Sequence, residues 1–330
     1  MINIPLMRTT AVAALALATS FGVATTASAQ SEPAIDSIHF LIPGGAGGGW
    51  DGTARGTGEA LTGAGLVGTA SYENMSGGGG GRAIGYIIEN AESNHGTLMV
   101  NSTPIIIRSL TGMFPQNFRD LTMVAGTIGD YAAIVVADDS AVQGMPDLIS
   151  AFEDDPSAVS VGGGSVPGGM DHLVAAMVMQ AGGIDPTQVT YVAYDGGGEA
   201  LAGLLSGEID ALSTGFSEAV ELARAGEVRI VGVTSDERVP TYDEAPTMVE
   251  QGLDTTFVNW RGFFGPPDLP EETLAAYQEV LAQMYDTDEW EEVRQRNGWV
   301  NIHNSGADFE TFLENQEQEI GDLMRTLGFL

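Results

Sequence analysis

Residues 37–61 read SIHFLIPGGAGGGWDGTARGTGEAL, and this stretch contains the pattern that predicts the fold. The apolar run at 37–43 is typical of a strand, the glycine-rich residues 44–49 predict a loop, and residues 51–61 predict a helix. A strand that leads through a glycine loop into a helix is the repeating unit of α/β proteins.

The same alternation continues along the chain. Further strands are predicted at 69–73, 97–101, 121–125, 132–137, 158–162, 189–193, 211–213 and 228–234. Helices are predicted at 83–92, 147–153, 170–181, 198–206 and 217–225, and three more, with acid-rich first turns, at 270–285, 288–297 and 307–327. Strands alternating with helices at this spacing indicate parallel α/β sheets.

The first 29 residues have the order of a secretory signal peptide. Arg8 is their only charge, residues 11–18 are apolar, and Ala27-Ser28-Ala29 is a small-residue cleavage pattern. A membrane anchor is the alternative, but the apolar run is short and is broken by Thr and Ser. We expect cleavage after Ala29. No later stretch approaches the ~20 apolar residues of a spanning helix, so we expect the mature chain to be soluble.

The remaining length favours two domains, because about 300 residues exceed what one hydrophobic core usually serves. The chain contains no cysteine, which rules out thiol catalysis and cysteine-ligated metal sites.

Charge is the most unusual property of the sequence. There are 45 acidic and 12 basic residues, and every basic residue is arginine. Loss of Arg8 with the signal peptide takes the net charge from −33 to −34. We expect no nucleic-acid partner, because phosphate contacts need clustered basic residues. The acids are dispersed over expected helix faces and turns, so we interpret them as surface adaptation to a saline exterior.

The first glycine loop permits two interpretations. Gly47, Gly49 and Gly52 have the GxGxxG spacing of a dinucleotide-binding loop, and Glu73 follows about twenty residues later. In a chain with 45 glycines, however, such a match arises easily by chance. The second interpretation is an anion cradle, in which glycine amides and a helix N-terminus face a carboxylate.

Glycines and hydroxyls recur after several of the expected strands. They lie at 44–49, 76–81, 102–103, 162–169, 196–198 and 213–214. Each hydroxyl can donate to a carboxylate oxygen without burying a charge. Any single one is more simply an ordinary turn residue, and it is their recurrence at the strand ends that favours a ligand site. Arg82 and Arg261 could each bind a carboxylate with two hydrogen bonds, or form an internal salt bridge instead.

An enzyme would need a nucleophile and a base, or a metal site. Asp171 and His172 lie near Ser165, but there is no GxSxG elbow, and His39, His95, His172 and His303 lack metal-ligand spacing. We therefore expect no catalytic residue, no metal and no cofactor. An exported hydrolase or a nucleotide-cofactor enzyme that uses the glycine loop is the alternative.

Motifs along the mature chain together resemble one family. They are PGGAGGGWD at 43–51 with Arg55, ENMSGGG at 73–79, YVAYDGGGE at 191–199, LLSGEID at 204–210, VGVTSDER at 231–238, APTMVEQG at 245–252 and RGFFGP at 261–266. The sequence is similar to the substrate-binding proteins of tripartite tricarboxylate transporters, the Bug-type receptors. Within them the YDGGGE and RGF segments resemble the citrate-type branch.

The resemblance implies a periplasmic-binding-protein-like fold of type II, with two α/β lobes, a ligand between them and a chain that crosses between the lobes twice. It also implies a periplasmic location, a small carboxylate ligand of the citrate-like di- or tricarboxylate class, and membrane transporter subunits as partners. A receptor for another transporter or for a chemosensory partner is the remaining alternative. We expect a monomer that is not an enzyme.

The family's contacts fall on named positions of this chain, and with Arg261 they form the predicted ligand site. That site comprises Gly45, Ala46, Gly47, Gly48, Ser76, Gly77, Gly78, Gly79, Ser102, Thr103, Ser165, Tyr194, Asp195, Gly196, Gly197, Ser213 and Arg261. Ser76 stands where the family usually has proline, and Trp50 is bulky. The predicted lobes are residues 33–133 with 239–330, and residues 134–238.

Overall fold

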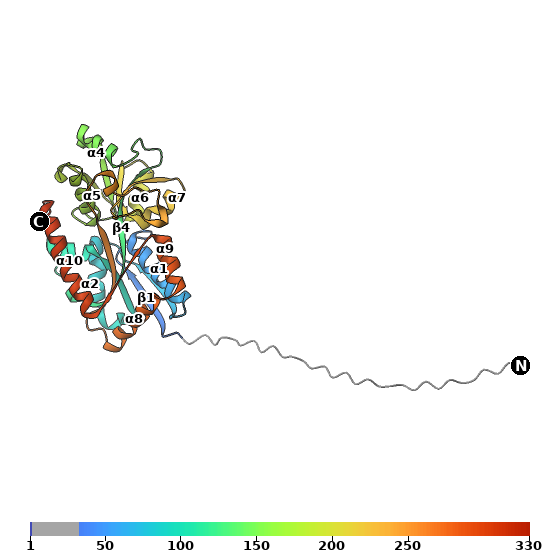
Figure 1. The fold of residues 1–330 in the computed structure, drawn as a ribbon. Coiled ribbons are helices and arrows are strands. Elements are labelled where there is room, and N and C mark those ends of the chain that lie inside the picture. The colour runs from blue at the N-terminus through green and yellow to red at the C-terminus, as the bar shows by residue number, and fades with distance from the viewer. Residues whose placement is uncertain (2–32) are drawn as a thin grey trace. The chain divides into compact units, whose positions relative to one another are not determined.

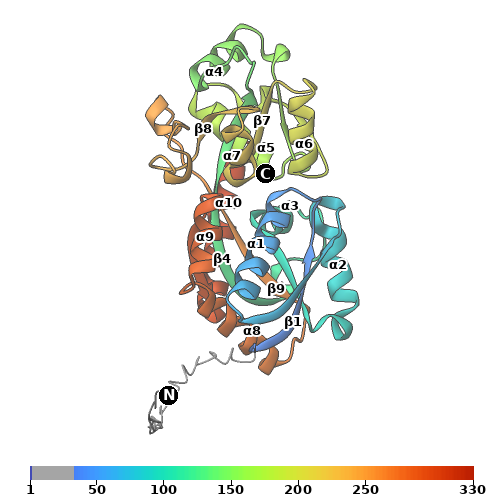
Figure 2. The same ribbon diagram turned by 90° about the vertical axis from the view of Figure 1, so that its right-hand side faces the viewer.

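The computed structural model describes Met1 and residues 33–330. Apart from Met1, the predicted signal peptide lies outside the described residues. Residues 33–330 belong to one compact unit. Its elements are described below and follow the colour bar in Figures 1 and 2.

Two sheets share one long strand, β4 (Thr122–Ala137). The first sheet has the order β2-β1-β3-β9-β4-β10, and the second has the order β8-β4-β7-β5-β6. Strand β4 pairs with β9 as far as Tyr131 and with β7 from Ala132. The other strands of the first sheet are β1 (Ile35–Ile42), β2 (Val67–Asn74), β3 (Thr97–Ser102), β9 (Val258–Gly265) and β10 (Val300–Ser305). Those of the second are β5 (Ser160–Gly163), β6 (Thr190–Ala193), β7 (Ala211–Gly215) and β8 (Val228–Val233).

Helices pack on both faces of each sheet, as Figure 2 shows. One face of the first sheet is covered by α1 (Gly49–Gly63), α8 (Glu271–Met284) and α9 (Asp288–Asn297), and the other by α2 (Gly81–Glu89), α3 (Thr103–Thr111) and α10 (Gly306–Thr326). The second sheet packs with α4 (Met145–Asp154), α5 (Met170–Ala181), α6 (Gly197–Leu205) and α7 (Phe216–Arg224). The chain therefore forms two α/β lobes, one around each sheet.

Period-two alternation sends neighbouring strand residues to opposite faces. In β1, Phe40 packs with α1 and α8 while Leu41 packs with α2 and α3. In β4, Ile134 joins the core that contains α5, whereas Val135 packs with α6 and α7. All four side chains are almost fully buried, which explains why such strands are near-continuous apolar runs.

The prediction of parallel sheets is wrong in part, because both sheets are mixed. Strands β1, β2 and β3 are parallel, but β9 is antiparallel to β3 and to β4. The two strands predicted at 121–125 and 132–137 are one 16-residue strand, β4. Gly126 and Gly129 interrupt its apolar pattern because the side chains of Asn304 and Val258 fill the places where a Cβ would lie.

Among the α-helices and strands of residues 33–330, three were not predicted. Strand β9 contains a buried arginine, Arg261, which breaks the apolar alternation. Strand β10 is half polar, with the sequence VNIHNS. Helix α3 begins directly at the end of β3, so no loop signal separates the two elements.

Within residues 33–330, none of the helices combines the length and the apolar character that a bilayer-spanning helix requires.

A matched pair of leucines tests the core. Leu281 of α8 is fully buried, whereas Leu205 at the end of α6 is 46% exposed. We expect Leu281→Ala to lower the free energy of unfolding by about 2–5 kcal/mol, because it leaves a cavity. Leu205→Ala should change it by less than about 0.5 kcal/mol. Urea unfolding followed by circular dichroism measures both, and equal effects would contradict the described packing of α8.

Candidate ligand-binding site

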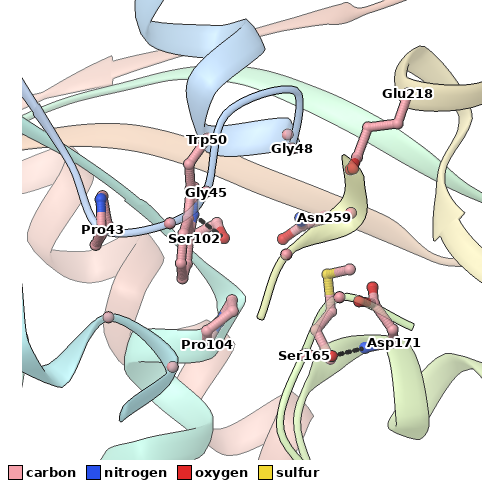
Figure 3. Close-up of a pocket in the computed structure, with 18 of the residues that line it drawn as sticks. Pro43, Gly45, Gly48, Trp50, Ser102, Pro104, Ser165, Asp171, Glu218 and Asn259 are labelled. Carbon is pink, nitrogen blue, oxygen red and sulfur yellow. Dashed lines mark hydrogen bonds between the residues drawn. The ribbon is translucent and has the colours of Figure 1, made fainter. Parts of the chain in front are cut away.

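One pocket is lined by loops from both lobes. Its volume is about 90 Å³, several times the ~10–15 Å³ that holds one water molecule. Such a cavity suits a small organic ligand and is small for a dinucleotide. Figure 3 shows Gly45, Trp50 and Ser102 on one side and Ser165 and Asp171 on the other.

The first glycine loop leads from β1 into α1. Gly48 is extended (φ −84°) and caps the helix, which begins at Gly49. Both glycines and Trp50 line the pocket. The first amides of a helix have no intrahelical partner and carry a partial positive charge, so this end of α1 suits an anion.

Asp51 holds the same loop in place. Its carboxylate accepts hydrogen bonds from the Gly47 amide (3.0 Å), from Arg55 Nε (2.8 Å) and from Asn74 Nδ2 (3.0 Å). The Gly47 amide is thus already occupied, and Gly47 is not among the lining residues. Asp51 and Arg55 therefore hold the loop in its conformation, and neither side chain lines the pocket.

Arg261 lines the pocket, and its side chain is 2% exposed. Its guanidinium pairs with Asp130 at 2.8 Å and donates to the Gly49 carbonyl at 3.0 Å and to Thr53 Oγ1 at 3.1 Å. The Glu218 carboxylate lies 3.7 Å away. Arg261 thus forms an internal ion pair, the alternative that the sequence left open, and it also lines the pocket.

Glycine is required at position 49 by this arrangement. A Cβ there would lie 2.0 Å from Arg261 Nη2 and 2.8 Å from a Glu218 carboxylate oxygen. No side chain fits at that distance, so the start of α1 can approach the guanidinium only as glycine.

The second glycine loop and the end of β3 complete the first wall. Gly79 and Gly80 line the pocket at a 3₁₀ turn, η1 (Gly78–Gly80), that leads into α2. Ser102 is buried, and its hydroxyl accepts a hydrogen bond of 2.9 Å from the Trp50 indole nitrogen. Arg82 instead donates to the Ser76 carbonyl at 3.3 Å, and it is exposed and is not a lining residue.

The opposite wall comes from the ends of β5 and β6. Ser165 Oγ accepts a hydrogen bond of 2.8 Å from the Asp171 amide, at the start of α5. Residues 195–197 touch the first loop directly: a Cβ at Gly45 would lie 3.3 Å from the Asp195 carbonyl oxygen, and one at Gly48 would lie 3.4 Å from the Gly197 amide nitrogen. The two lobes are therefore in contact at the rim of the pocket.

Burial raises the pKa of three acidic side chains at the site. It raises the pKa of Glu218 to about 8, against the opposing effect of Arg261. It raises the pKa of Asp171 to about 6, although hydrogen bonds from Ser165 and Gly164 lower it. Burial also raises the pKa of Asp130.

Some predicted site residues come together in this pocket and others do not. Those that line it are Gly45, Gly48, Gly79, Ser102, Ser165, Asp195, Gly196, Gly197 and Arg261. Those that do not are Ala46, Gly47, Ser76, Gly77, Gly78, Thr103, Tyr194 and Ser213. Most of the second set adjoin lining residues in the same loops. Ser213 is wholly buried in β7.

Several lining residues were not predicted. They are Pro43, Gly44, Gly49, Trp50, Gly80, Pro104, Gly164, Met170, Asp171, Glu218 and Asn259. The glycines and Trp50 adjoin predicted positions and could have been found by extending each loop. Glu218 and Asn259 had no such signal, because each lies on an element that only the tertiary fold brings to the pocket.

His172 is held by packing. Its ring stacks on Tyr191 at 4.4 Å and meets the edge of Phe329 at 4.8 Å, and its Nδ1 accepts the Gly168 amide. These contacts indicate a structural residue. Among the described residues there is no group of three or more His, Cys, Asp or Glu side chains that could hold a metal ion.

Comparison with solved structures identifies the fold class. The chain superposes on the periplasmic binding protein BugD with a TM-score of 0.79, at 19% identity over 89% of this chain and 98% of that one. It superposes on MatC from Rhodopseudomonas palustris with bound malate with a TM-score of 0.76, at 20% identity over 87% and 98%. For the R. palustris protein Rpa4515 with adipate the TM-score is 0.79, at 20% identity over 90% and 99%. The fold is that of a type II periplasmic binding protein.

The family follows from the sequence itself. The profile of the tripartite tricarboxylate transporter family receptors matches residues 63–329, and the chain belongs to this family of binding receptors, which are not enzymes. Curated relatives include BugT of Bordetella pertussis, 25% identical over 74% of each chain. A UPF0065 protein of Pseudomonas sp. strain P51 is 27% identical over 61% of this chain and 60% of its own.

Two glycines of α1 test the close approach to Arg261. Gly49→Ala should displace the guanidinium and lower the free energy of unfolding by about 1–3 kcal/mol through overpacking. Gly52→Ala is the control, because nothing lies within 4 Å of a Cβ at that position. Alanine there should be neutral or should stabilise by up to ~1 kcal/mol. Chemical denaturation measures the free energy of unfolding of both variants. If Gly49→Ala left it unchanged, the described contact with Arg261 would be wrong.

Removal of the buried guanidinium should be costly. Arg261→Met leaves Asp130 unpaired in the interior and should lower the free energy of unfolding by about 3–5 kcal/mol. Because burial already raises the Asp130 pKa, the loss should be larger at pH 8 than at pH 5, where this carboxyl can take up a proton.

Two further variants control this result. Adding Asp130→Asn to Arg261→Met should recover part of the loss. Arg296→Met removes an exposed pair with Glu59 (2.7 Å) and should cost less than about 1 kcal/mol. If Arg261→Met were no worse than Arg296→Met, Arg261 would have no structural role.

Proposed function

We propose that this protein is a periplasmic receptor that captures a small carboxylate of the di- or tricarboxylate class between its lobes and delivers it to the membrane subunits of a tripartite tricarboxylate transporter. One observation supports this most directly: a small pocket in which the N-terminus of α1 and glycine loops from both lobes converge. Two proteins of the same fold were solved with malate and with adipate.

We further propose how the chain is divided between the lobes. One lobe would comprise residues 33–133 and 239–330, and the other residues 134–238. Strand β4 and the segment between β8 and β9 would then be the two crossings, and closure would bring the loops at 44–49 and 195–197 together. Of the predicted contacts, those that line the pocket are the proposed ligand-binding residues.

The proposed mechanism is closure of the two lobes around the ligand. The ligand contacts both walls, so it binds the closed form more tightly than the open form and shifts the population toward closure. The membrane subunits would recognise the closed form. A chain that binds its ligand in this way needs no partner copy, and we expect it to act as a monomer.

A ligand screen tests the proposal. The mature protein is heated in high salt with citrate, succinate, malate, adipate, aromatic acids, amino acids or NAD. A ligand present at 100 times its Kd and bound only by the folded state adds about 2.7 kcal/mol. We therefore expect a clear rise in Tm with at least one di- or tricarboxylate and none with NAD.

A glycine variant tests whether the rise in Tm comes from binding in the pocket. A Cβ at Gly164 would lie 2.3 Å from the Gly197 amide nitrogen, whereas a Cβ at Gly85 meets nothing within 4 Å. Gly164→Ala should weaken binding at least tenfold, because it pushes residues 196–197 out of place. Gly85→Ala should bind normally. If no carboxylate raised the Tm, the proposed function would be refuted. If Gly164→Ala bound its ligand normally, the proposed site would be refuted.

A further inference from the structure

One buried arginine has no acidic partner. Arg108 lies in the last turn of α3 and is 4% exposed, and within residues 33–330 its Nε and Nη1 donate to no acceptor. All arginines except Arg8 lie in that range, and each of the others forms an ion pair apart from Arg82, which is exposed. In a chain of net charge −33, a buried guanidinium without an acid is unusual, because a buried charge is costly unless it is paired.

The immediate surroundings of Arg108 compensate its charge only in part. The Phe114 ring centroid lies 5.5 Å from the guanidinium carbon, and the C-terminal end of a helix favours a cation. Neither supplies an acceptor to Nε or Nη1. The nearby Glu317 instead accepts from Ser109 at 3.0 Å and pairs with Arg119. Burial lowers the pKa of Arg108 to about 10, so the guanidinium is still protonated at neutral pH.

A second cavity lies beside this guanidinium. We call it the α3 chamber; Pro104, Ile107 and Arg108 of α3 line it together with Val166 and other residues of the segment 164–169, which follows β5. Its volume is about 50 Å³, several times what one water molecule needs. Among its lining residues Arg108 is the one charged side chain, and none is acidic. The chamber therefore has an uncompensated positive charge.

The α3 chamber adjoins the ligand pocket but is distinct from it. Both cavities are lined by Trp50, Gly79, Pro104, Gly164 and Ser165, and Figure 3 labels three of these residues, Trp50, Pro104 and Ser165. Arg108 lines only the chamber. A Cβ at Gly79 would lie 2.8 Å from Arg108 Nη2 and 3.5 Å from Val166 Cγ2. The guanidinium thus packs against the second glycine loop without lining the ligand pocket.

The lining of the chamber favours a small, simple anion. Pro104, Ile107, Met113 and Val166 are apolar and offer no side-chain donor. An oxyanion has several acceptor oxygens, and those that found no donor here would lose their hydration without replacement. A halide carries one charge on one atom of about the size of a water molecule. Its attraction to a guanidinium is strong where little water screens the charges.

We propose that the α3 chamber is a halide-binding site, in which a chloride-class anion lies beside Arg108 as its counterion, separate from the ligand pocket. Because α3 belongs to one lobe and residues 164–169 to the other, a halide bound there also stabilises the contact between the lobes. Its tests with halide salts use no organic ligand, so they do not depend on the proposed function.

Thermal unfolding at constant ionic strength is the first test. Sodium chloride or sodium bromide replaces sodium isethionate, whose anion is a bulkier sulfonate. We expect the Tm of the mature protein to rise by at least about 2 °C and to reach a plateau as the site saturates. Arg108→Met should abolish the saturable rise, whereas Arg108→Lys, which keeps a charge, should retain a weaker one.

Arg82→Met is the matched control. Arg82 also lacks an ion pair within residues 33–330, but it is exposed and does not line the chamber. Its loss lowers the positive charge of the protein by the same amount as the loss of Arg108. We expect Arg82→Met to keep the full halide response. A response that Arg82→Met and Arg108→Met reduced equally would reflect net charge alone and would overturn the site.

Bromide crystals of the unmodified protein locate the anion directly. Bromide scatters anomalously, and we expect an anomalous peak in the α3 chamber beside Arg108. This measurement also decides the question if Arg108→Met fails to fold. Bromide peaks at other places only, or a saturable rise in Tm that Arg108→Met left unchanged, would overturn the proposal.

A ligand carboxylate that reaches the chamber is the other source of such a charge. Binding of malate and of adipate is therefore measured by calorimetry at low and at saturating chloride. For a separate site, chloride leaves the Kd of each acid unchanged or lowers it. If chloride raised the Kd tenfold and Arg108→Met removed this competition, the ligand itself would occupy the chamber, and the separate halide site would be overturned.

Discussion

The arrangement of the site depends on the buried ion pair between Arg261 and Asp130. The guanidinium is the point where β9, β4 and the start of α1 meet, since it contacts Asp130 and the Gly49 carbonyl together. Through Glu218 it also reaches α7 of the other lobe. A charge taken out of water must be matched by partners of good geometry, and this requirement fixes where all four elements lie relative to one another.

Glycine makes this convergence possible. The guanidinium packs directly on Gly49, and a Glu218 oxygen would lie 1.8 Å from a Cβ at Gly197. Any side chain at either position would separate the charged groups from the loops. The glycine-rich loops therefore let the walls approach closely enough to make a small pocket.

Sequence patterns predicted much of the fold and part of the site. Helices such as α5 and α9 were found with their observed bounds, because apolar periodicity and capping residues act locally. Strand β9 was missed, since an arginine in an apolar stretch can be understood only once its partner Asp130, far away in the chain, is known. Gly45 and Ser165 were predicted at the pocket because they lie in glycine-rich loops that follow strands. Glu218 and Asn259 were missed, because only the tertiary fold brings them to the pocket. The lobe boundaries remain a prediction.

The shared strand β4 also governs how the molecule can assemble. In the first sheet β9 lies between β3 and β4, although the whole second sheet intervenes in the chain. Strand β10, near the end of the chain, completes the other side of β4. Neither edge of β4 in the first lobe is therefore covered until residues 258–305 have joined it. Pairings so distant in sequence slow folding relative to helical proteins of similar length. Until then, the part of β4 at residues 122–131 lacks both of its neighbouring strands and is prone to pairing with another chain.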